Sequence, residues 1–201
     1  MIENNMKAGV QVSHRADPIV SGNRIHSGEG GGIMVHDQAR GTFAKNVLEK
    51  SKRAGIGVTD CAAPVFTGNT ISNNEGGGAV LAGRCSPVLA SNLFTANGFV
   101  GIGMKKSARA LLEDNVILGN EGYGLLMQAT CSAQLQGSTL RGNRRAAICV
   151  CEQASLTMSH CVIDPGKMSE AFAEQVRRTA LAFLCVTGCV LTVSSLVSHT
   201  D

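Results

Sequence analysis

A short row of ionisable residues recurs at steps of 23 along the first half of the chain. The row ends at a glycine and consists of His14, Asp37, Asp60 and Gly83, with His36 beside Asp37 and Arg84 beside its end. Neighbouring carboxylates can act as general acid and base on a sugar, or they can share a metal ion. The alternative is that both acids are polar turn residues that splay into water. The choice depends on whether the fold stacks residues that are 23 apart.

Asparagine and glycine follow the same step through most of the chain. Glycine occurs six times at this 23-residue interval between residues 9 and 124. The asparagine column reads Asn23, Asn46, Asn69, Asn92 and Asn115. A fixed period of about 20–50 residues is typical of a solenoid, in which each repeat packs only on its neighbours.

Four positions of the repeat hold only apolar residues in seven successive copies. Two of these positions are separated by two residues, as in Ile33 and Val35, which is the period of a strand. Asparagine and glycine interrupt every copy, so a ten-residue helix does not fit. The sequence therefore predicts an all-β fold, a right-handed parallel β-helix solenoid of about seven 23-residue rungs. Rungs stacked at the ~4.8 Å strand spacing would place Asp37 and Asp60 about 5 Å apart.

The asparagine column is expected to be structural. Asparagine tolerates a left-handed bend, and its amide can bond to the amides one rung above and below, which predicts a ladder inside the coil. The column lapses at Ser138 and Cys161. A second column is interpreted as turn residues on the outer turn, and it reads Asn5, Gly28, Ser51, Asn74, Asn97, Asn120 and Asn143.

The repeat accounts for residues 1–165, and we expect residues 166–201 to form a separate C-terminal unit. The first rung is incomplete, which is typical of a fragment or short isoform of a longer protein. Ser169 followed by an acidic first turn predicts a helix up to Arg178. Residues 179–198 then carry no charge. We expect a helical and apolar cap here; the alternative is a membrane segment, and only through residues 179–198.

Composition argues against two classes of ligand. The formal net charge is +3, and the basic clusters lack the aromatic residues that stack on bases, so no nucleic-acid partner is expected. Sugar sites commonly use Trp and Tyr platforms, whereas this chain has no Trp and a single tyrosine, Tyr123.

The eight cysteines predict neither disulfides nor a metal site. Cys85 and Cys131 share a column two rungs apart, too far to bridge without distortion. Cys149 and Cys151 are two apart on a strand and no CxxC motif is present, so zinc is not expected, nor any other cofactor. Free thiols, the lack of an N-glycosylation sequon and the lack of a signal sequence favour a cytoplasmic location.

The repeat resembles that of a known family in its amino-acid sequence as well as in its period. Residues 64–78 read PVFTGNTISNNEGGG, and GTFAKN at 41–46 leads to AGIGV at 54–58. These phrases resemble the right-handed β-helix repeats of large F-box-only proteins, which are substrate receptors of SCF-type ubiquitin ligases. The resemblance covers roughly Asn5 to Ile163. Pectin-type enzymes and bacterial periplasmic copper-pathway proteins share the repeat, so the fold alone does not dictate function.

The resemblance implies a non-catalytic module that binds a client protein for ubiquitination. No F-box is visible, so a ligase adaptor would bind only if an F-box lies elsewhere in the full protein. We expect the polar row to contact the client, namely His14, Asp37, Asp60 and Arg84. The alternative is a carbohydrate-active β-helix enzyme of the polysaccharide lyase or hydrolase type that uses Asp37 and Asp60.

Overall fold

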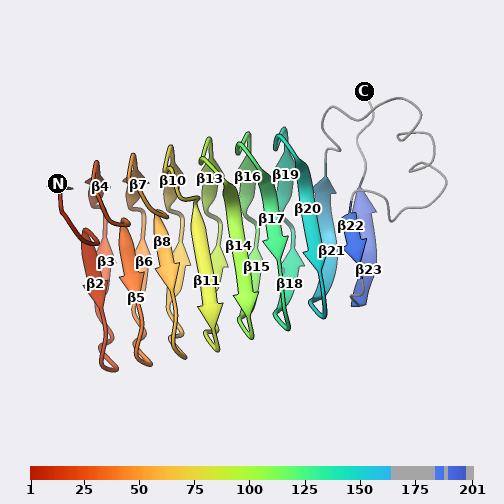
Figure 1. Cartoon of the computed structure of the whole chain (residues 1–201), viewed down its shortest axis with the longest axis horizontal. Coiled ribbons are helices and arrows are strands. Elements are labelled where there is room, and N and C mark those ends of the chain that lie inside the picture. The colour runs from red at the N-terminus through yellow and green to blue at the C-terminus, as the bar shows by residue number, and fades with distance from the viewer. Residues whose placement is uncertain (164–183, 188–189, 198–201) are drawn as a thin grey trace.

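The chain winds into a coil of parallel strands whose rungs lie side by side along the long axis (Figure 1). The computed structural model describes residues 1–163 and two further strands at 184–187 and 190–197. Every strand pairing joins residues 23 apart up to β20, as in Ile33 with Ile56 and Ile71 with Phe94. The predicted right-handed parallel β-helix of about seven rungs is confirmed.

Each rung contributes three strands, which form three columns along the coil. The first column holds β3 (Ile19–Ser21), β6 (Thr42–Ala44), β9 (Val65–Thr67), β12 (Val88–Ala90), β15 (Arg109–Glu113), β18 (Ser132–Gln136), β21 (Ser155–Ile163) and β23 (Val190–Val197). The second holds β1 (Ile2–Glu3), β4 (Arg24–His26), β7 (Val47–Glu49), β10 (Thr70–Ser72), β13 (Leu93–Thr95), β16 (Val116–Leu118) and β19 (Thr139–Arg141). The third holds β2 (Val10–Val12), β5 (Ile33–Val35), β8 (Ile56–Val58), β11 (Ala79–Gly83), β14 (Val100–Lys106), β17 (Tyr123–Met127), β20 (Ala146–Cys151) and β22 (Leu184–Thr187).

The core is the interior of the coil, filled by the inward residue of each short strand. Phe43 and Phe66 are both fully buried, and their rings stack with centroids 4.6 Å apart. Leu48 and Ile56 are fully buried as well. Because burial of one such side chain contributes about 1.5–3 kcal/mol, the repeated inward positions dominate the stability of every rung.

The corner between the first two columns is held by buried asparagines. Asn69 donates from Nδ2 to Asn92 Oδ1 (2.9 Å) and to the Phe43 carbonyl (2.9 Å). Its backbone N–H also donates to Asn92 Oδ1 at 2.9 Å. At the C-terminal end the backbone N–H of Asn115 donates to Ser138 Oγ at 3.1 Å. These bonds satisfy backbone groups at a bend where no strand ladder can reach them.

A second ladder runs inside the corner between the second and third columns. Asn74 donates from Nδ2 to Asn97 Oδ1 (3.1 Å) and to the Leu48 carbonyl (3.0 Å), and Asn120 donates to Asn143 Oδ1 (2.9 Å). The interpretation of this column as outer-turn residues was wrong for these members. Their side chains point inward because six-residue turns such as 27–32 have their own carbonyls and N–H groups to satisfy.

The last rung continues the coil. β22 pairs in parallel with β20, and β23 pairs in parallel with β21. The expected helix from Ser169 to Arg178 lies outside the described residues, as does most of the expected cap. Within the residues that the structure describes, no helix has the length and apolarity to span a membrane.

Candidate functional site

The candidate site is built on the turns that follow β2, β5 and β8. Each turn closes with a backbone hydrogen bond of 3.1 Å between its first and fourth residues, as in Ala39 N to His36 O. Both central residues of each turn have left-handed φ angles: His14 and Arg15 (55° and 61°), Asp37 and Gln38 (53° and 60°), Asp60 and Cys61 (50° and 62°). Aspartate tolerates this conformation better than most residues with a side chain.

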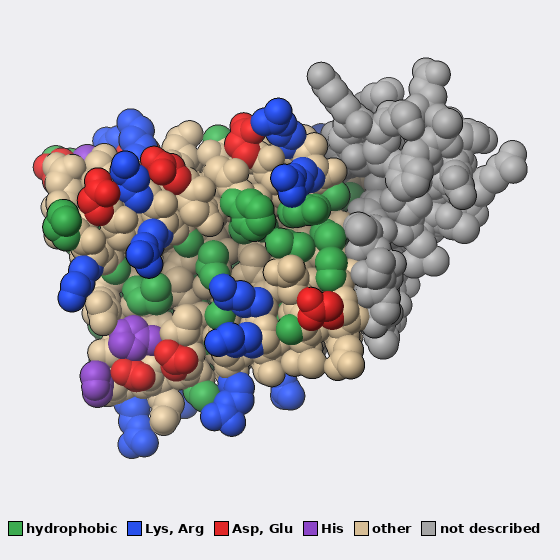
Figure 2. All heavy atoms as spheres, viewed as in Figure 1, with side chains coloured by type: hydrophobic (Ala, Val, Ile, Leu, Met, Phe, Trp, Pro, Cys, Tyr) green, Lys and Arg blue, Asp and Glu red, His purple; other side chains and the backbone are tan. Residues whose placement is uncertain are grey.

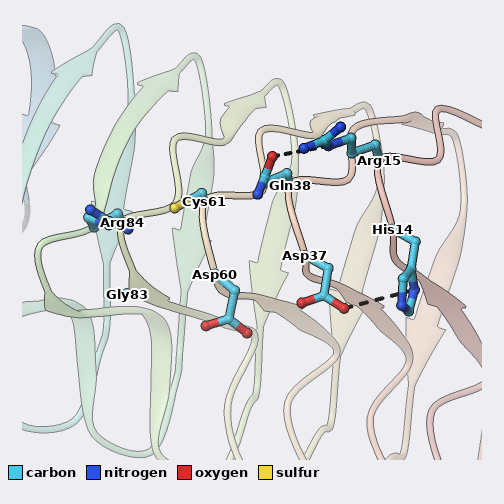
Figure 3. A pocket seen from close by; sticks show the side chains of 8 residues that line it. All are labelled: His14, Arg15, Asp37, Gln38, Asp60, Cys61, Gly83 and Arg84. Carbon is cyan, nitrogen blue, oxygen red and sulfur yellow. Dashed lines mark hydrogen bonds and ion pairs between the residues drawn. The ribbon is translucent and has the colours of Figure 1, made fainter.

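Backbone hydrogen bonds hold these turns in register. Arg15 N donates to the Asp37 carbonyl (3.1 Å), and Gln38 N donates to the Asp60 carbonyl (3.0 Å). Ala39 is fully buried at the tight corner behind the turn. The three turns are therefore near copies, and the side chains at equivalent positions point to the same side of the coil (Figure 3).

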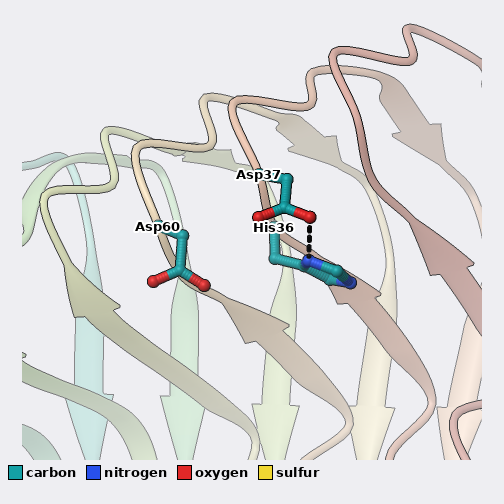
Figure 4. A group of neighbouring side chains, drawn as sticks. All are labelled: His36, Asp37 and Asp60. Carbon is teal, nitrogen blue, oxygen red and sulfur yellow. Dashed lines mark ion pairs between the residues drawn. The ribbon is translucent and has the colours of Figure 1, made fainter.

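The structure brings Asp37, Asp60 and His36 together. One oxygen of each carboxylate and one ring nitrogen of His36 all lie within 4.8 Å of one another. His36 Nδ1 is 3.1 Å from Asp37 Oδ2 (Figure 4), and Thr59 Oγ1 donates to Asp60 Oδ2 at 2.9 Å. The Asp37 side chain is 46% exposed, so the carboxylates face solvent at the end of their strands.

His36 has a second polar partner. Its Nε2 lies 2.9 Å from Nε2 of Gln11, which comes from the neighbouring rung. With the Gln11 amide donating to Nε2, the proton of the neutral imidazole sits on Nδ1 and is donated to Asp37. Three further residues of the site were not predicted from the sequence, namely Gln11, Thr59 and Gln38. Each lies within three residues of His14, Asp37 or Asp60.

The other two predicted residues, His14 and Arg84, line the two ends of a groove that also contains Asp37 and Asp60 (Figure 3). His14 Nδ1 is 3.9 Å from Asp37 Oδ2, and the His14 side chain is 86% exposed. Arg84 lines the far end without an ion pair to any residue that the structure describes. Gly83 (φ 80°) stands between Asp60 and Arg84 and puts no side chain into the space. The groove has a volume of about 730 Å³.

The groove is charged and has no aromatic wall. Figure 2 shows histidine and acidic side chains gathered at the lower left, over the N-terminal rungs, with lysine and arginine around them. Arg15 is tied to this surface by its Nε, which donates to Gln38 Oε1 at 3.2 Å. Such a surface suits a ligand that carries its own charges.

Among the described residues, His36, Asp37 and Asp60 are the one group of three or more His, Cys, Asp or Glu side chains close enough to share a metal ion. Two carboxylates and an imidazole are ligands for divalent cations of the hard to borderline kind. Ligation by Nδ1 of His36 requires the other tautomer, with the Gln11 amide turned so that its oxygen accepts from Nε2. The amide orientation of Gln11 therefore determines whether Nδ1 of His36 carries a proton or can bind a cation.

Comparison with known proteins identifies the fold. A family model described as the right-handed beta helix region matches residues 1–108 and 92–173. No curated protein matches the chain. Crystal structures of the periplasmic alginate epimerase AlgG are similar to it. A point mutant of AlgG has a TM-score of 0.73 and 17% identity over 96% of this chain and 48% of the other. Another AlgG structure has a TM-score of 0.63 and 15% identity over 90% of this chain and 47% of the other.

These neighbours correct two sequence-based expectations. They are described as epimerases, which contradicts the non-catalytic assignment, and as periplasmic, which contradicts the cytoplasmic location. The cysteine argument failed because buried thiols such as Cys85 and Cys131 are kept apart by the strand register, whatever the redox compartment. No F-box context emerges from the matches. The chain spans about half the length of these structures, and at 17% identity or less the likeness establishes the fold alone.

Proposed function

From the premise that the chain belongs to the right-handed beta helix family, we propose that it acts on an acidic polysaccharide, with Asp37 and Asp60 as its proton-transfer pair. One observation carries the proposal: two carboxylates that line an open groove converge with the imidazole of His36, with their ligand atoms within 4.8 Å of one another. The likeness to structures described as alginate epimerase supports a uronate substrate.

The arginine at the far end of the groove supports an anionic substrate. Arg84 has no ion-pair partner among the described residues, so its guanidinium is available to a uronate carboxylate. Planar bidentate pairing of arginine with carboxylate is strong and directional. The lone tyrosine, Tyr123, is outside the residues that line the groove. Substrate binding by ion pairs replaces the aromatic stacking that neutral sugars use.

The placement of the acids favours elimination over hydrolysis. A glycosidase places its two carboxyl groups on either side of the scissile bond. Asp37 and Asp60 come from consecutive turns and project from the same side of the coil (Figure 3). Groups on one side of a sugar can remove a proton and return one without crossing the ring. This arrangement fits a lyase.

The proton-transfer roles follow from the contacts. Asp60 lies beside the open space at Gly83 and takes the proton from the carbon next to the uronate carboxylate. The electron pair of that C–H bond forms a carbon–carbon double bond as the glycosidic bond to the next carbon breaks. Asp37, protonated on Oδ1, the oxygen that does not contact His36, gives this proton to the leaving oxygen. Arg84 neutralises the charge that develops on the substrate carboxylate.

The test is lyase activity of the purified chain on polymannuronate and polygalacturonate, followed by the ultraviolet absorbance of the unsaturated product. Asp37→Asn and Asp60→Asn are each expected to lower the rate about 100-fold or more, the usual contribution of general acid–base catalysis. Asp114→Asn is the matched control, because Asp114 is also exposed and also has a left-handed φ, of 51°, but stands at a different corner. No cleavage of either polymer, or full activity in both groove variants, would refute the proposal.

A further inference from the structure

A pair of thiols lies far along the coil from the groove, on the outer face of β20. Cys149 and Cys151 are alternate residues of this strand, so both side chains project to the same side. Their sulfur atoms are 3.4 Å apart. The motif is CxC rather than CxxC, and on an extended strand this spacing is the one that brings two thiols together.

The sulfur separation distinguishes two uses of such a pair. The sulfurs of a disulfide are about 2.0 Å apart. Two thiolates bound at ~2.3 Å to one tetrahedral ion are about 3.8 Å apart. The observed 3.4 Å is a contact between two reduced thiols, and it lies within ~0.4 Å of the separation that a shared metal ion requires. Alternate residues of a strand also have α-carbons about 6.6 Å apart, at the long limit of what a disulfide spans.

The surroundings of the two thiols also suit a soft metal ion. Cys149 is 4% exposed and packs with Val100 and Leu126 in a small apolar cluster separate from the main core. Cys151 is partly exposed at the edge of this cluster, which gives an ion a route in from solvent. In the pairing of β20 with β22, Cys185 is the register partner of Cys149.

We propose that Cys149 and Cys151 form a dithiolate site for a soft divalent metal ion of the Zn²⁺ and Cd²⁺ kind. Thiolate sulfur is the ligand type that selects such ions over Mg²⁺ and Ca²⁺. Each thiol loses its proton as its sulfur binds, so binding releases up to two protons and involves no oxidation. The site is independent of the polysaccharide groove, which is built on β2, β5, β8 and β11.

The experiment is a titration of the full, reduced chain with Cd²⁺ alone. We expect one thiolate-bound ion per chain, counted by the ultraviolet absorption of the cadmium–thiolate bond, together with proton release in a weakly buffered solution. Cys149→Ser and Cys151→Ser are each expected to weaken binding about 100-fold, the share of one ligand in a structural zinc site. Cys61→Ser is the control, because Cys61 is an exposed cysteine on another rung.

A second measurement needs no variant. Cd²⁺ should protect the partly exposed Cys151 of the unmodified chain from alkylation and leave Cys61 reactive, as read by mass spectrometry. Cd²⁺ binding that persists unchanged in the Cys149→Ser/Cys151→Ser double variant would refute the proposal. Absence of the cadmium–thiolate absorption, or equal alkylation of Cys151 with and without Cd²⁺, would refute it as well.

Discussion

Asp37 and Asp60 occupy the same position in consecutive turns, with φ angles of 53° and 50°, and their carboxylates face solvent side by side. Backbone bonds between the turns hold them there, including Gln38 N to the Asp60 carbonyl. The fold itself thus keeps two like charges close together, which costs stability. A cation bound between the two carboxylates would relieve this cost.

Removal of one charge should therefore stabilise the free protein. Asp60→Asn is expected to raise the melting temperature at neutral pH by about 1–2 °C, since close exposed charges contribute modestly and asparagine suits the left-handed turn. The gain should shrink in high salt. Asp114→Asn, outside the pair, is the control. Thermal melts at two salt concentrations measure both effects, and a lower melting temperature for Asp60→Asn would contradict this account.

The first asparagine ladder should be more sensitive in its middle than at its end. Asn69→Ala removes the acceptor of the Asn46 backbone N–H (2.9 Å) and the donor to the Phe43 carbonyl, both inside the coil. Buried polar groups left without partners should destabilise the fold by about 3–5 kcal/mol. Asn23→Ala is the comparison, because Asn23 lies at the partly exposed end of the ladder and its Nδ2 donates outward to the Ser21 carbonyl. Urea unfolding of both variants measures the two losses of unfolding free energy. Equal losses would contradict the expected order.

Close approach of rungs makes particular glycines irreplaceable. A Cβ on Gly78 would overlap the backbone oxygen of Gly101 and would lie 2.8 Å from Cδ1 of Phe94. Gly78→Ala should therefore cost about 3 kcal/mol or more, because backbone cannot move aside within a stacked rung. A Cβ on Gly57 meets only the end of the Met34 side chain, which is flexible. Gly57→Ala should cost less than about 1 kcal/mol, and a chemical denaturation series in which the two variants match would overturn the argument.

The rung was predictable because its inward positions are chemically uniform. Phe43, Phe66 and Leu89 stand 23 apart, and no alternative fold places such residues in one buried column. The inward direction of the Asn97 side chain was not predictable from turn preference, since asparagine is also common in exposed outer turns. Only the burial of its amide beside the Ile71 carbonyl shows that the turn needs an internal partner.

The positions of the site residues could be predicted from the same 23-residue period, whereas their side-chain contacts could not. Asp37 and Asp60 follow from the register, but the contact of Gln11 with His36 joins residues 25 apart and depends on side-chain direction. The lack of aromatic residues was read as evidence against a sugar site. That argument holds for neutral sugars that stack on rings, and it does not apply to the uronate that we propose as the ligand of Arg84.

Burial of Cys85 gives the protein a specific weakness at alkaline pH. Burial raises the pKa of this thiol to about 11, with smaller contributions from the nearby charges of Asp60 and Cys61. Because the pKa is higher in the folded state, stability is intact below the ordinary thiol pKa near 9 and falls as pH rises from 9 to 11. A shift of this size costs at most about 2–3 kcal/mol.

Cys85→Ala should remove part of this alkaline loss without opening a large cavity, since alanine fills the same buried column at Ala62 and Ala108. Burial also raises the pKa of Cys131 and Cys161, so the variant should flatten the pH dependence only partly. Urea unfolding of the wild type and the variant between pH 7 and 11 measures the difference, in which the titration of other groups cancels. Cys61→Ala, at an exposed position, should leave the wild-type curve unchanged. Parallel curves for Cys85→Ala and the wild type would show that the thiol does not ionise on unfolding in this range.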